Sequence, residues 1–349
     1  MQPTSGSIIS LDLKTASEQE YAALTDLFNR IRSETHPDDP PIPLETRVRR
    51  WQNLPPFMGI SVFIAREPEG EKIKAAGMIQ FMRTQENQHL AQFDLNVLPE
   101  YRRQGLGSRL LAEIVKVAVR ENRRVLVCQT NERIPAGEAL MRRIGASKGL
   151  EGHTNQLKIE DLNPQLIEAW QERAKERASG FEIGFWNGAY PEEQLAAIAE
   201  LMEVMNEQPH GEIEIEDMHY TPELLRQMEA GMFADGTERW TLYARERATG
   251  EFAGFTDVLW RPAMPEILRQ ANTGVWPRFR SLGLGRWLKA AMLEKILKDR
   301  PQVKIIRTGN ADSNAAMLKI NNELGFKPYL SEAMWQVGTE RVQAYLAHG

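Results

Sequence analysis

Two short glycine motifs in matching places constrain this chain more than any other feature. RRQGLG occupies residues 102–107, and RSLGLG occupies residues 280–285. The second motif begins 178 residues after the first, which is about half of the 349-residue chain. A chain of this length accommodates about two domains of ordinary size. The sequence therefore predicts one structural unit that is present twice.

The segments around the two motifs are also similar. Residues 95–119 and 272–297 share a V-x-P step, an aromatic residue before arginine, the glycine pair and an amphipathic run. Before each motif, apolar and alternating runs predict a hairpin and one more strand. After it, each half has a helix pattern, a β-branched run and a second helix that ends at glycine. Each half also opens with a helix pattern.

This order predicts an α+β fold, in which each half is a mixed, mostly antiparallel sheet flanked by helices. We expect an N-terminal domain at residues 1–162, a linker helix at 163–180 and a C-terminal domain at 181–349. The charged composition of the linker, without internal glycine, predicts that its helix is exposed. The two domains could form a covalent pseudo-dimer about an approximate two-fold axis.

Composition excludes several classes of partner. A net charge of −5 without a long Lys/Arg tract argues against nucleic acid. No apolar run approaches the ~20 residues that cross a membrane, and the N-terminus does not resemble a secretory signal. The single cysteine, Cys128, excludes an internal disulfide, so we expect a cytoplasmic protein. The six histidines form no HxH or HxxxH pair, and we expect no metal site.

The glycine motifs have a physical use. A glycine loop at the start of a helix leaves backbone N–H groups unpaired, and the helix dipole adds positive character there. Together they favour phosphate, and glycine allows close approach of the backbone. Neither motif is a Walker A loop or the dinucleotide G-x-G-x-x-G, because Arg109 and Leu110, or Trp287 and Leu288, occupy the region of the third glycine.

A strand followed by R-x-x-G-x-G and a helix resembles the phosphate loop of the GCN5-related N-acetyltransferase (GNAT) family. The resemblance covers nearly the whole chain, twice. It is strongest in the second half, where Asn314 lies eleven residues before Gly325 and Phe326 follows. That half also resembles tandem bacterial acetyltransferases such as mycothiol synthase. The resemblance implies two acyl-CoA N-acyltransferase-like domains.

The resemblance also implies acetyl-CoA as the cofactor and assigns residues to it. Asn314 is expected to support the pantetheine arm, and the two loops to hold the pyrophosphate. The residues so assigned in the second half are Val275, Arg280, Ser281, Leu282, Gly283, Leu284, Gly285 and Arg286. Those in the first half are Val97, Arg102, Arg103, Gln104, Gly105, Leu106, Gly107 and Ser108.

In the family, a primary amine attacks the thioester directly, and a backbone N–H holds the carbonyl oxygen. By position, that donor falls at Val275 and Val97. Many members carry a tyrosine acid where this chain has Met141 and Asn321. Methionine cannot donate a proton, whereas asparagine can donate a hydrogen bond to the sulfur. The first half also lacks the pantetheine asparagine, so we expect the C-terminal domain to be the catalyst.

A base for the ammonium proton is expected in the segment between the first two helices of each half. Glu212 is our candidate there, and Asp257, on a strand before the second loop, is another. The alternatives are a solvated acidic loop and a polar residue on an open sheet face. The full set of titratable residues in these segments is Glu34, His36, Asp38, Asp39, His210, Glu212, Glu214, Glu216, Asp217 and His219.

The sequence therefore supports an acetyl-CoA-dependent N-acetyltransferase that acts on a small-molecule amine or a peptide amine. Two alternatives stay open. The first is a non-catalytic CoA-binding tandem pseudo-acetyltransferase, which the missing tyrosines motivate, and the second is a repeat whose glycines only form turns. The identity of the amine and the choice between a monomer with an internal pseudo-dimer and a homodimer are not determined by the sequence.

Overall fold

The chain folds into two compact units, each made from more than one stretch of sequence. The computed structural model describes residues 7–67 and 72–348. The first unit comprises Met1–Glu151, His210–Glu216 and Leu330–Gly349, and the second comprises Gly152–Pro209 and Asp217–Tyr329. The expected domains, 1–162 and 181–349, are continuous instead. The compact units differ from them chiefly because the segment around residues 210–216 and the C-terminal strand and helix lie in the first unit.

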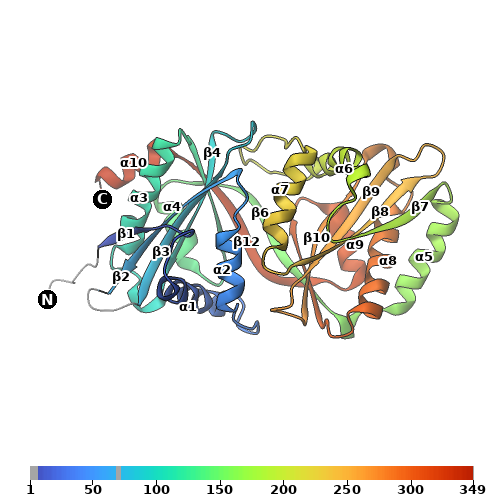
Figure 1. The fold of residues 1–349 in the computed structure, drawn as a ribbon, viewed down its shortest axis with the longest axis horizontal. Helices are drawn as coiled ribbons and strands as arrows, with labels where there is room; N and C mark the ends of the chain where they lie inside the picture. The colour runs from blue at the N-terminus through green and yellow to red at the C-terminus, as the bar shows by residue number, and fades with distance from the viewer. Residues whose placement is uncertain (1–6, 68–71, 349) are drawn as a thin grey trace. The chain divides into compact units, whose positions relative to one another are not determined.

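The first unit is a six-stranded sheet with helices on both faces (Figure 1). Its strand order is β1-β2-β3-β4-β5-β12, and only the β4–β5 pair is parallel. Its elements are β1 (Ile8–Leu11), α1 (Glu18–Thr35), α2 (Leu44–Gln52), β2 (Met58–Arg66), β3 (Ile73–Met82), β4 (Leu90–Val97), α3 (Leu106–Arg120), β5 (Val125–Asn131), α4 (Pro135–Arg143), the start of β6 (Ser147–Lys158), most of β12 (Lys327–Gly338) and α10 (Thr339–His348).

The second unit repeats this arrangement. Its strand order is β7-β8-β9-β10-β11-β6, with β10–β11 as the parallel pair. Its elements are the rest of β6, α5 (Pro164–Arg177), β7 (Phe181–Asn187), α6 (Leu195–Met202), α7 (Pro222–Phe233), β8 (Glu238–Glu246), β9 (Phe252–Trp260), β10 (Ile267–Val275), α8 (Leu284–Asp299), β11 (Ile305–Ala311) and α9 (Ala315–Leu324). The mostly antiparallel mixed sheets and the element order that the sequence predicted are confirmed.

Each half of the sequence gives its last strand to the sheet of the other half. β12 follows α9 in the second half, yet it pairs antiparallel with β5. β6 follows α4 in the first half, yet its residues 152–158 pair antiparallel with β11. The C-terminal helix α10, red in Figure 1, consequently packs against α3 of the first unit. Each unit therefore depends on residues from both halves of the sequence.

Side chains alternate between the two faces of each sheet, so each sheet packs against a hydrophobic core on both faces. In β2, Val62 and Ile64 pack with α1, whereas Phe63 and Ala65 pack with α3. Such a strand is apolar on both faces because side chains alternate from one face to the other. The second unit has the same layers, with α5 and α8 on one face and α6 on the other.

The helix α5 is the connecting segment that the sequence predicted to be an exposed linker. A helix is present there, but Ile167, Trp170 and Ala174 are buried, and α5 packs against α8 in the second unit. The prediction was based on the high charge of this segment and did not take account of its apolar residues, which recur with helical spacing. Within residues 7–67 and 72–348, no helix combines the length and the apolar character needed to cross a membrane.

Candidate functional site

Each parallel strand pair separates after three residues, and this separation opens a cleft in each unit. β4 pairs with β5 only from Leu90 to Gln92, and β10 pairs with β11 only from Ile267 to Arg269. The remainder of β4 and of β10 keeps its antiparallel neighbour on the other side. The edge that faces the cleft is therefore free of strand pairing, and its backbone groups are available to a ligand.

The glycine motifs form tight turns that begin the helices α3 and α8. Gly105 and Gly283 are the N-caps, with φ of 78° and 87°, a conformation that glycine adopts without strain. No side chain caps either helix, so the first-turn N–H groups have no partner within the helix. A Cβ placed on Gly105, Gly107 or Gly283 would meet no atom within 4 Å, so these positions face open space.

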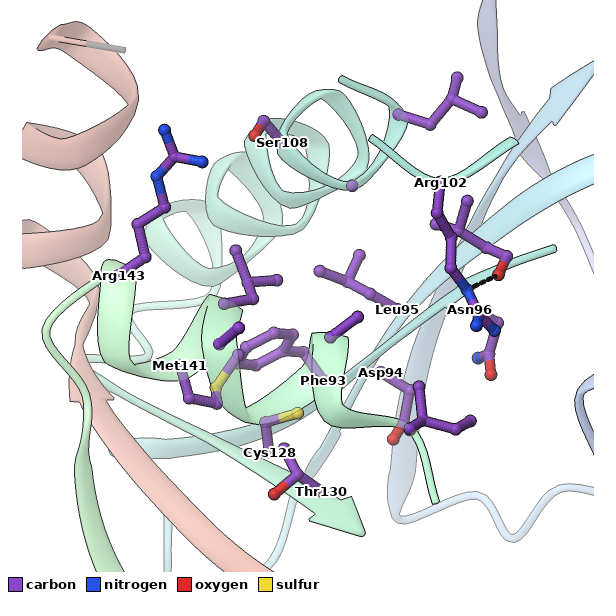
Figure 2. Close-up of a pocket in the computed structure, with 18 of the residues that line it drawn as sticks. Phe93, Asp94, Leu95, Asn96, Arg102, Ser108, Cys128, Thr130, Met141 and Arg143 are labelled. Atoms are coloured by element: carbon purple, nitrogen blue, oxygen red, sulfur yellow. Dashed lines mark hydrogen bonds between the residues drawn. The ribbon is translucent and has the colours of Figure 1, made fainter. Parts of the chain in front are cut away.

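The arginine that opens each motif binds the end of the preceding strand. Arg102 Nε donates to the carbonyl oxygen of Val97 at 2.9 Å, and Arg280 Nε donates to that of Val275 at 3.0 Å. Arg102 also pairs with Glu34 at 2.7 Å. Figure 2 shows this arginine turned toward the strand end. Sequence reasoning missed this contact; the predicted contact of both guanidinium groups with pyrophosphate stays a prediction.

The backbone N–H of Val97 points into the first cleft. Leu98 N–H donates to Lys74 O on β3, and consecutive N–H groups of a strand point to opposite sides. The N–H of Val97 must therefore point away from β3, toward the side of β5. The same argument holds for Val275, because Trp276 N–H donates to Ala253 O on β9. Both residues thus occupy the position that the sequence predicted for the donor to a carbonyl oxygen.

The first cleft is a cavity of ≈ 590 Å³ within the first unit. It extends from the glycine loop, residues 102–108, along the free edge of β4 to the C-terminal end of α1. Figure 2 shows Phe93, Cys128 and Met141 close together on its inner wall. Phe93 and Met141 are buried, so this wall is largely apolar. An apolar channel that begins at a helix N-terminus suits a ligand with an anionic end and a long, weakly polar arm.

Asp94 is the one carboxylate that lines the first cleft. Burial raises the pKa of this carboxyl above its ordinary value. Among the described residues, no hydrogen bond or ion pair reaches it, so nothing opposes this effect of burial. A carboxylate with a raised pKa is a better proton acceptor near neutral pH. From the sequence, Asp94 and Asn272 occupy equivalent strand positions that either face the cleft or cap the separated strand; the structure places Asp94 in the cleft lining, and the sequence did not assign it as the base.

Cys128 and Thr130 lie on β5 opposite Asp94, as Figure 2 shows. Burial, and then the charge of Asp94, raise the pKa of the Cys128 thiol, so it stays protonated at neutral pH. Thr130 Oγ1 accepts a hydrogen bond from Trp335 Nε1 at 2.8 Å. Trp335 lies on β12, and Tyr345 of α10 also lines the cleft. The C-terminal residues of the chain therefore complete the cleft of the first unit.

The second cleft is smaller and polar. It has a volume of ≈ 220 Å³, and no residue of the loop at 280–286 lines it. Asn321 is buried and joins a chain of polar contacts: Lys289 Nζ donates to its Oδ1 at 2.8 Å, and its Nδ2 donates to Asn310 Oδ1 at 2.7 Å. Burial lowers the pKa of Lys289 to about 7. The lining residues are Gln208, Pro209, Arg269, Gln270, Ala271, Asn272, Thr273, Lys289, Thr308, Gly309, Asn310, Ala311, Asn314 and Met317.

The other predicted residues have separate positions. Asn314 is the N-cap of α9, where its side chain accepts from Met317 N–H at 3.2 Å, and it lines the second cleft. Arg286 pairs with Glu323 of α9 at 2.9 Å, so it joins α8 to α9. Asp257 is buried, and burial raises its pKa although it accepts two hydrogen bonds from Asn272. Asp257 therefore orients Asn272 and does not line the cleft itself.

Glu212 is part of the first unit, although it follows the first helix of the second half. Its N–H donates to Gly149 O at 2.7 Å, and its carbonyl accepts from Gln336 Nε2. Its side chain is exposed and lines neither of the two clefts. Only Gln208 and Pro209 of the predicted acidic segment reach the second cleft. The segment's acidic residues therefore do not converge on that cleft, because its backbone bonds fix it elsewhere.

Comparison with known proteins finds a family model that matches part of the chain and solved structures that share the fold of nearly all of it. The sequence model of the acetyltransferase (GNAT) family matches residues 21–145. A tandem GNAT protein from the clavulanic acid biosynthesis pathway is 23% identical, with a TM-score of 0.76 over 95% of this chain and 98% of that one. A GCN5-related N-acetyltransferase from Sphaerobacter thermophilus is 14% identical, with a TM-score of 0.64 over 95% and 96%. No curated protein matches the sequence.

Proposed function

We propose that this chain, which has a tandem GNAT-type fold, is an acyl-CoA-dependent N-acyltransferase that binds its acyl donor in the first cleft. The observation that carries this proposal is the continuity of that cleft. It joins the uncapped N-terminus of α3 to the free edge of β4 through an apolar channel. The match of residues 21–145 to the acetyltransferase family supports it. A fold alone would not, since function depends on the site.

The residues of the first cleft fit the parts of acetyl-CoA, which supplies the acyl group as a thioester when it is bound. The N–H groups at residues 103–108 and the N-terminus of α3 suit the pyrophosphate. Gly107 leaves room for close approach, because a Cβ there would meet nothing within 4 Å. Phe93, Leu106 and Met141 give the weakly polar arm an apolar wall. Val97 N–H would donate to the carbonyl oxygen of the thioester.

Arg102 assists this donor indirectly. The N–H and C=O of Val97 face the same side of β4, so the carbonyl would repel a developing oxyanion beside it. Arg102 Nε donates a hydrogen bond to this carbonyl oxygen at 2.9 Å, and the charge of the guanidinium offsets the negative field of the carbonyl. Since Arg280 makes the same contact with Val275, the loop arginines serve to position the donor strand in both units.

The chemistry requires a neutral amine and a group that takes its proton. We assign the proton to Asp94, whose carboxylate lines the cleft and has a raised pKa. With an acyl-CoA bound, the amine nitrogen would bond to the acyl carbon as the C–S bond breaks, and the departing thiolate would take a proton from solvent. Because the Cys128 thiol stays protonated, we propose direct transfer without an acyl-cysteine. Met141 cannot supply a proton to the leaving sulfur.

The sequence favoured the C-terminal domain as catalyst, with Asn321, Val275, Glu212 and Asp257 as its candidate residues. That assignment is the competing hypothesis for the place of reaction. Asn321 supports it, because its amide lies beside the second cleft with Lys289. Matched loop variants distinguish the first unit from the second as the place of reaction, since Gly107→Val and Gly285→Val each block one glycine loop. The loop whose variant stops turnover belongs to the catalytic unit.

Release of free thiol from acetyl-CoA, followed with small amines, aminoglycosides and peptide N-termini as acceptors, tests the enzymatic claim. Turnover that disappears in Gly107→Val is the expected result. Stoichiometric binding of acetyl-CoA with no thiol release for any acceptor would favour the alternative, a CoA-binding pseudo-acetyltransferase. The buried Met141 at the position of the family's tyrosine is the observation that favours this second candidate.

A further inference from the structure

The second cleft differs from the first in the chemistry of its interior. Both clefts lie where a parallel strand pair separates, and residues of both strands and of the helix that follows the second strand line each of them. Four apolar or weakly polar positions of the first unit are polar in the second. Leu111, Cys128, Ile134 and Met141 correspond in order to Lys289, Thr308, Asn314 and Asn321. A channel that suits a thioester arm is thus replaced by a pocket lined with amides and an amine.

Lys289 is the central feature of this pocket. The residue is only 2% exposed, although it lines the cavity. Its ammonium group has three N–H donors, and Asn321 Oδ1 is the single hydrogen-bond acceptor that contacts it among the described residues. That acceptor is neutral, and no carboxylate pairs with Lys289 in the described part of the chain. Burial lowers the pKa of Lys289 to about 7 because its ammonium form lacks a counter-ion here, so a negative charge placed in this cavity would stabilise that form.

The rest of the lining also favours an anion. The cavity wall includes Arg269 and contains no Asp or Glu. Asn314 uses its Oδ1 to cap α9, so its Nδ2 is left to donate. The ten-residue helix α9 begins at this residue and adds the positive end of its dipole. Donors from α8, from α9 and from the cap of α9 therefore meet at one place.

We propose that the second cleft is a binding site for a small organic carboxylate, held by Lys289 Nζ and the side-chain amide of Asn314. Its volume of ≈ 220 Å³ equals about seven water volumes, which suits an acid of a few carbon atoms. Lys289 is the interior cation of the described lining, whereas Arg269 is exposed, so a monoanionic carboxylate matches the interior better than a phosphate dianion. The amide-rich wall selects an acid with a further hydroxyl, oxo or amino group. This site is independent of acyl-CoA binding in the first cleft.

Calorimetry on the full chain tests the proposal with lactate, pyruvate, glutamate and succinate as probes. Lactamide, the neutral analogue of lactate, inorganic phosphate and acetyl-CoA are the comparisons. We expect at least one of these acids to bind saturably, with one molecule per chain, and lactamide not to bind. Lys289→Met should weaken that binding at least 10-fold, and Lys298→Met, an exposed lysine on the same helix, should not change it.

A second variant distinguishes loss of the binding site from loss of the fold. Asn314→Asp keeps an N-cap acceptor for Met317 N–H but replaces the free amide by a carboxylate that repels the ligand. We expect it to weaken binding at least 10-fold while the melting temperature stays near that of the parent. Absence of saturable binding by every carboxylate, equal binding by lactamide, or unchanged affinity in both variants would overturn the proposal. Preference for phosphate, or a second acetyl-CoA lost in Lys289→Met, would overturn it too.

Discussion

The two clefts of this chain share one architecture and differ in what their walls can hold. In the first, Leu111 and Met141 complete an apolar core beside the channel. In the second, Lys289 and Asn321 take these places and bond to each other at 2.8 Å. The glycine loop opens on the first cavity, whereas residues 280–286 do not line the second. The two units thus share the scaffold and the glycine turn, while a few interior side chains give the two clefts different chemistry.

The largest effect that we expect separates the two glycine loops. Gly107→Val should weaken acetyl-CoA binding on the order of 1,000-fold, because the side chain displaces pyrophosphate from two or more charge-assisted hydrogen bonds. Gly285→Val, its matched counterpart, should change the affinity less than about 3-fold. A Cβ at Gly107 meets no protein atom within 4 Å, and one at Gly285 meets only Ile320 at 3.6 Å, so both variants should fold. Titration calorimetry measures both, and the opposite ranking would place the acyl donor in the second unit.

The next effect concerns Asp94. Asp94→Asn should lower kcat about 100-fold with a smaller change in KM, because the carboxylate takes the proton in the reaction step. Since burial raises its pKa, the parent rate should rise with pH through a value above the ordinary one of aspartate, as the carboxyl loses its proton. The variant should lose this rise. The matched change Asn272→Asp, at the equivalent strand position, should not restore it. A pH profile that is the same in Asp94→Asn would exclude Asp94 as the base.

The buried lysine should affect stability in a pH-dependent way. Its pKa is about 7 when folded and near 10.5 when unfolded, so between these values only the unfolded chain binds the proton. The free energy of unfolding should therefore rise with pH across this window, on the order of 5 kcal/mol in total. Lys289→Leu, which copies Leu111 of the first unit, should be more stable at pH 7 and should lack this rise. Urea denaturation at pH 7 and pH 9.5 measures the free energy of unfolding of the parent and of the variant. An equal change between the two pH values in both proteins would contradict burial of Lys289.

The smallest effect is expected at Cys128. Because its thiol stays protonated, Cys128→Ala should keep kcat within about 3-fold of the parent. The change leaves space beside Phe93 and Met141, so the stability should fall by about 1–2 kcal/mol. Steady-state kinetics and thermal unfolding measure the two quantities. Complete loss of turnover in a folded variant would instead indicate an acyl-cysteine on the reaction path.

Much of the fold follows from local features of the sequence. The repeat, the strand and helix order and the turns at Gly105 and Gly283 were all predicted, because periodicity and glycine positions act within a few residues. The family resemblance on the first loop agrees with the match of residues 21–145. The site was only partly predictable. The sequence located the loops and Val97 and left open whether Asp94 faces the cleft, but it missed Tyr345 and the burial of Lys289, which depend on distant partners.

The sequence by itself determined that one unit occurs twice, that each copy has a glycine turn before a helix, and which side chains can ionise. Only the tertiary structure decided that β6 and β12 complete the sheets of the opposite halves, since a strand's pattern specifies a buried face and not the partner that covers it. Only the tertiary structure also decided which ionisable side chains are buried. Lys289 is an ordinary helix lysine in the sequence, and it is buried with a lowered pKa only because α8 packs against β8, β9 and β10.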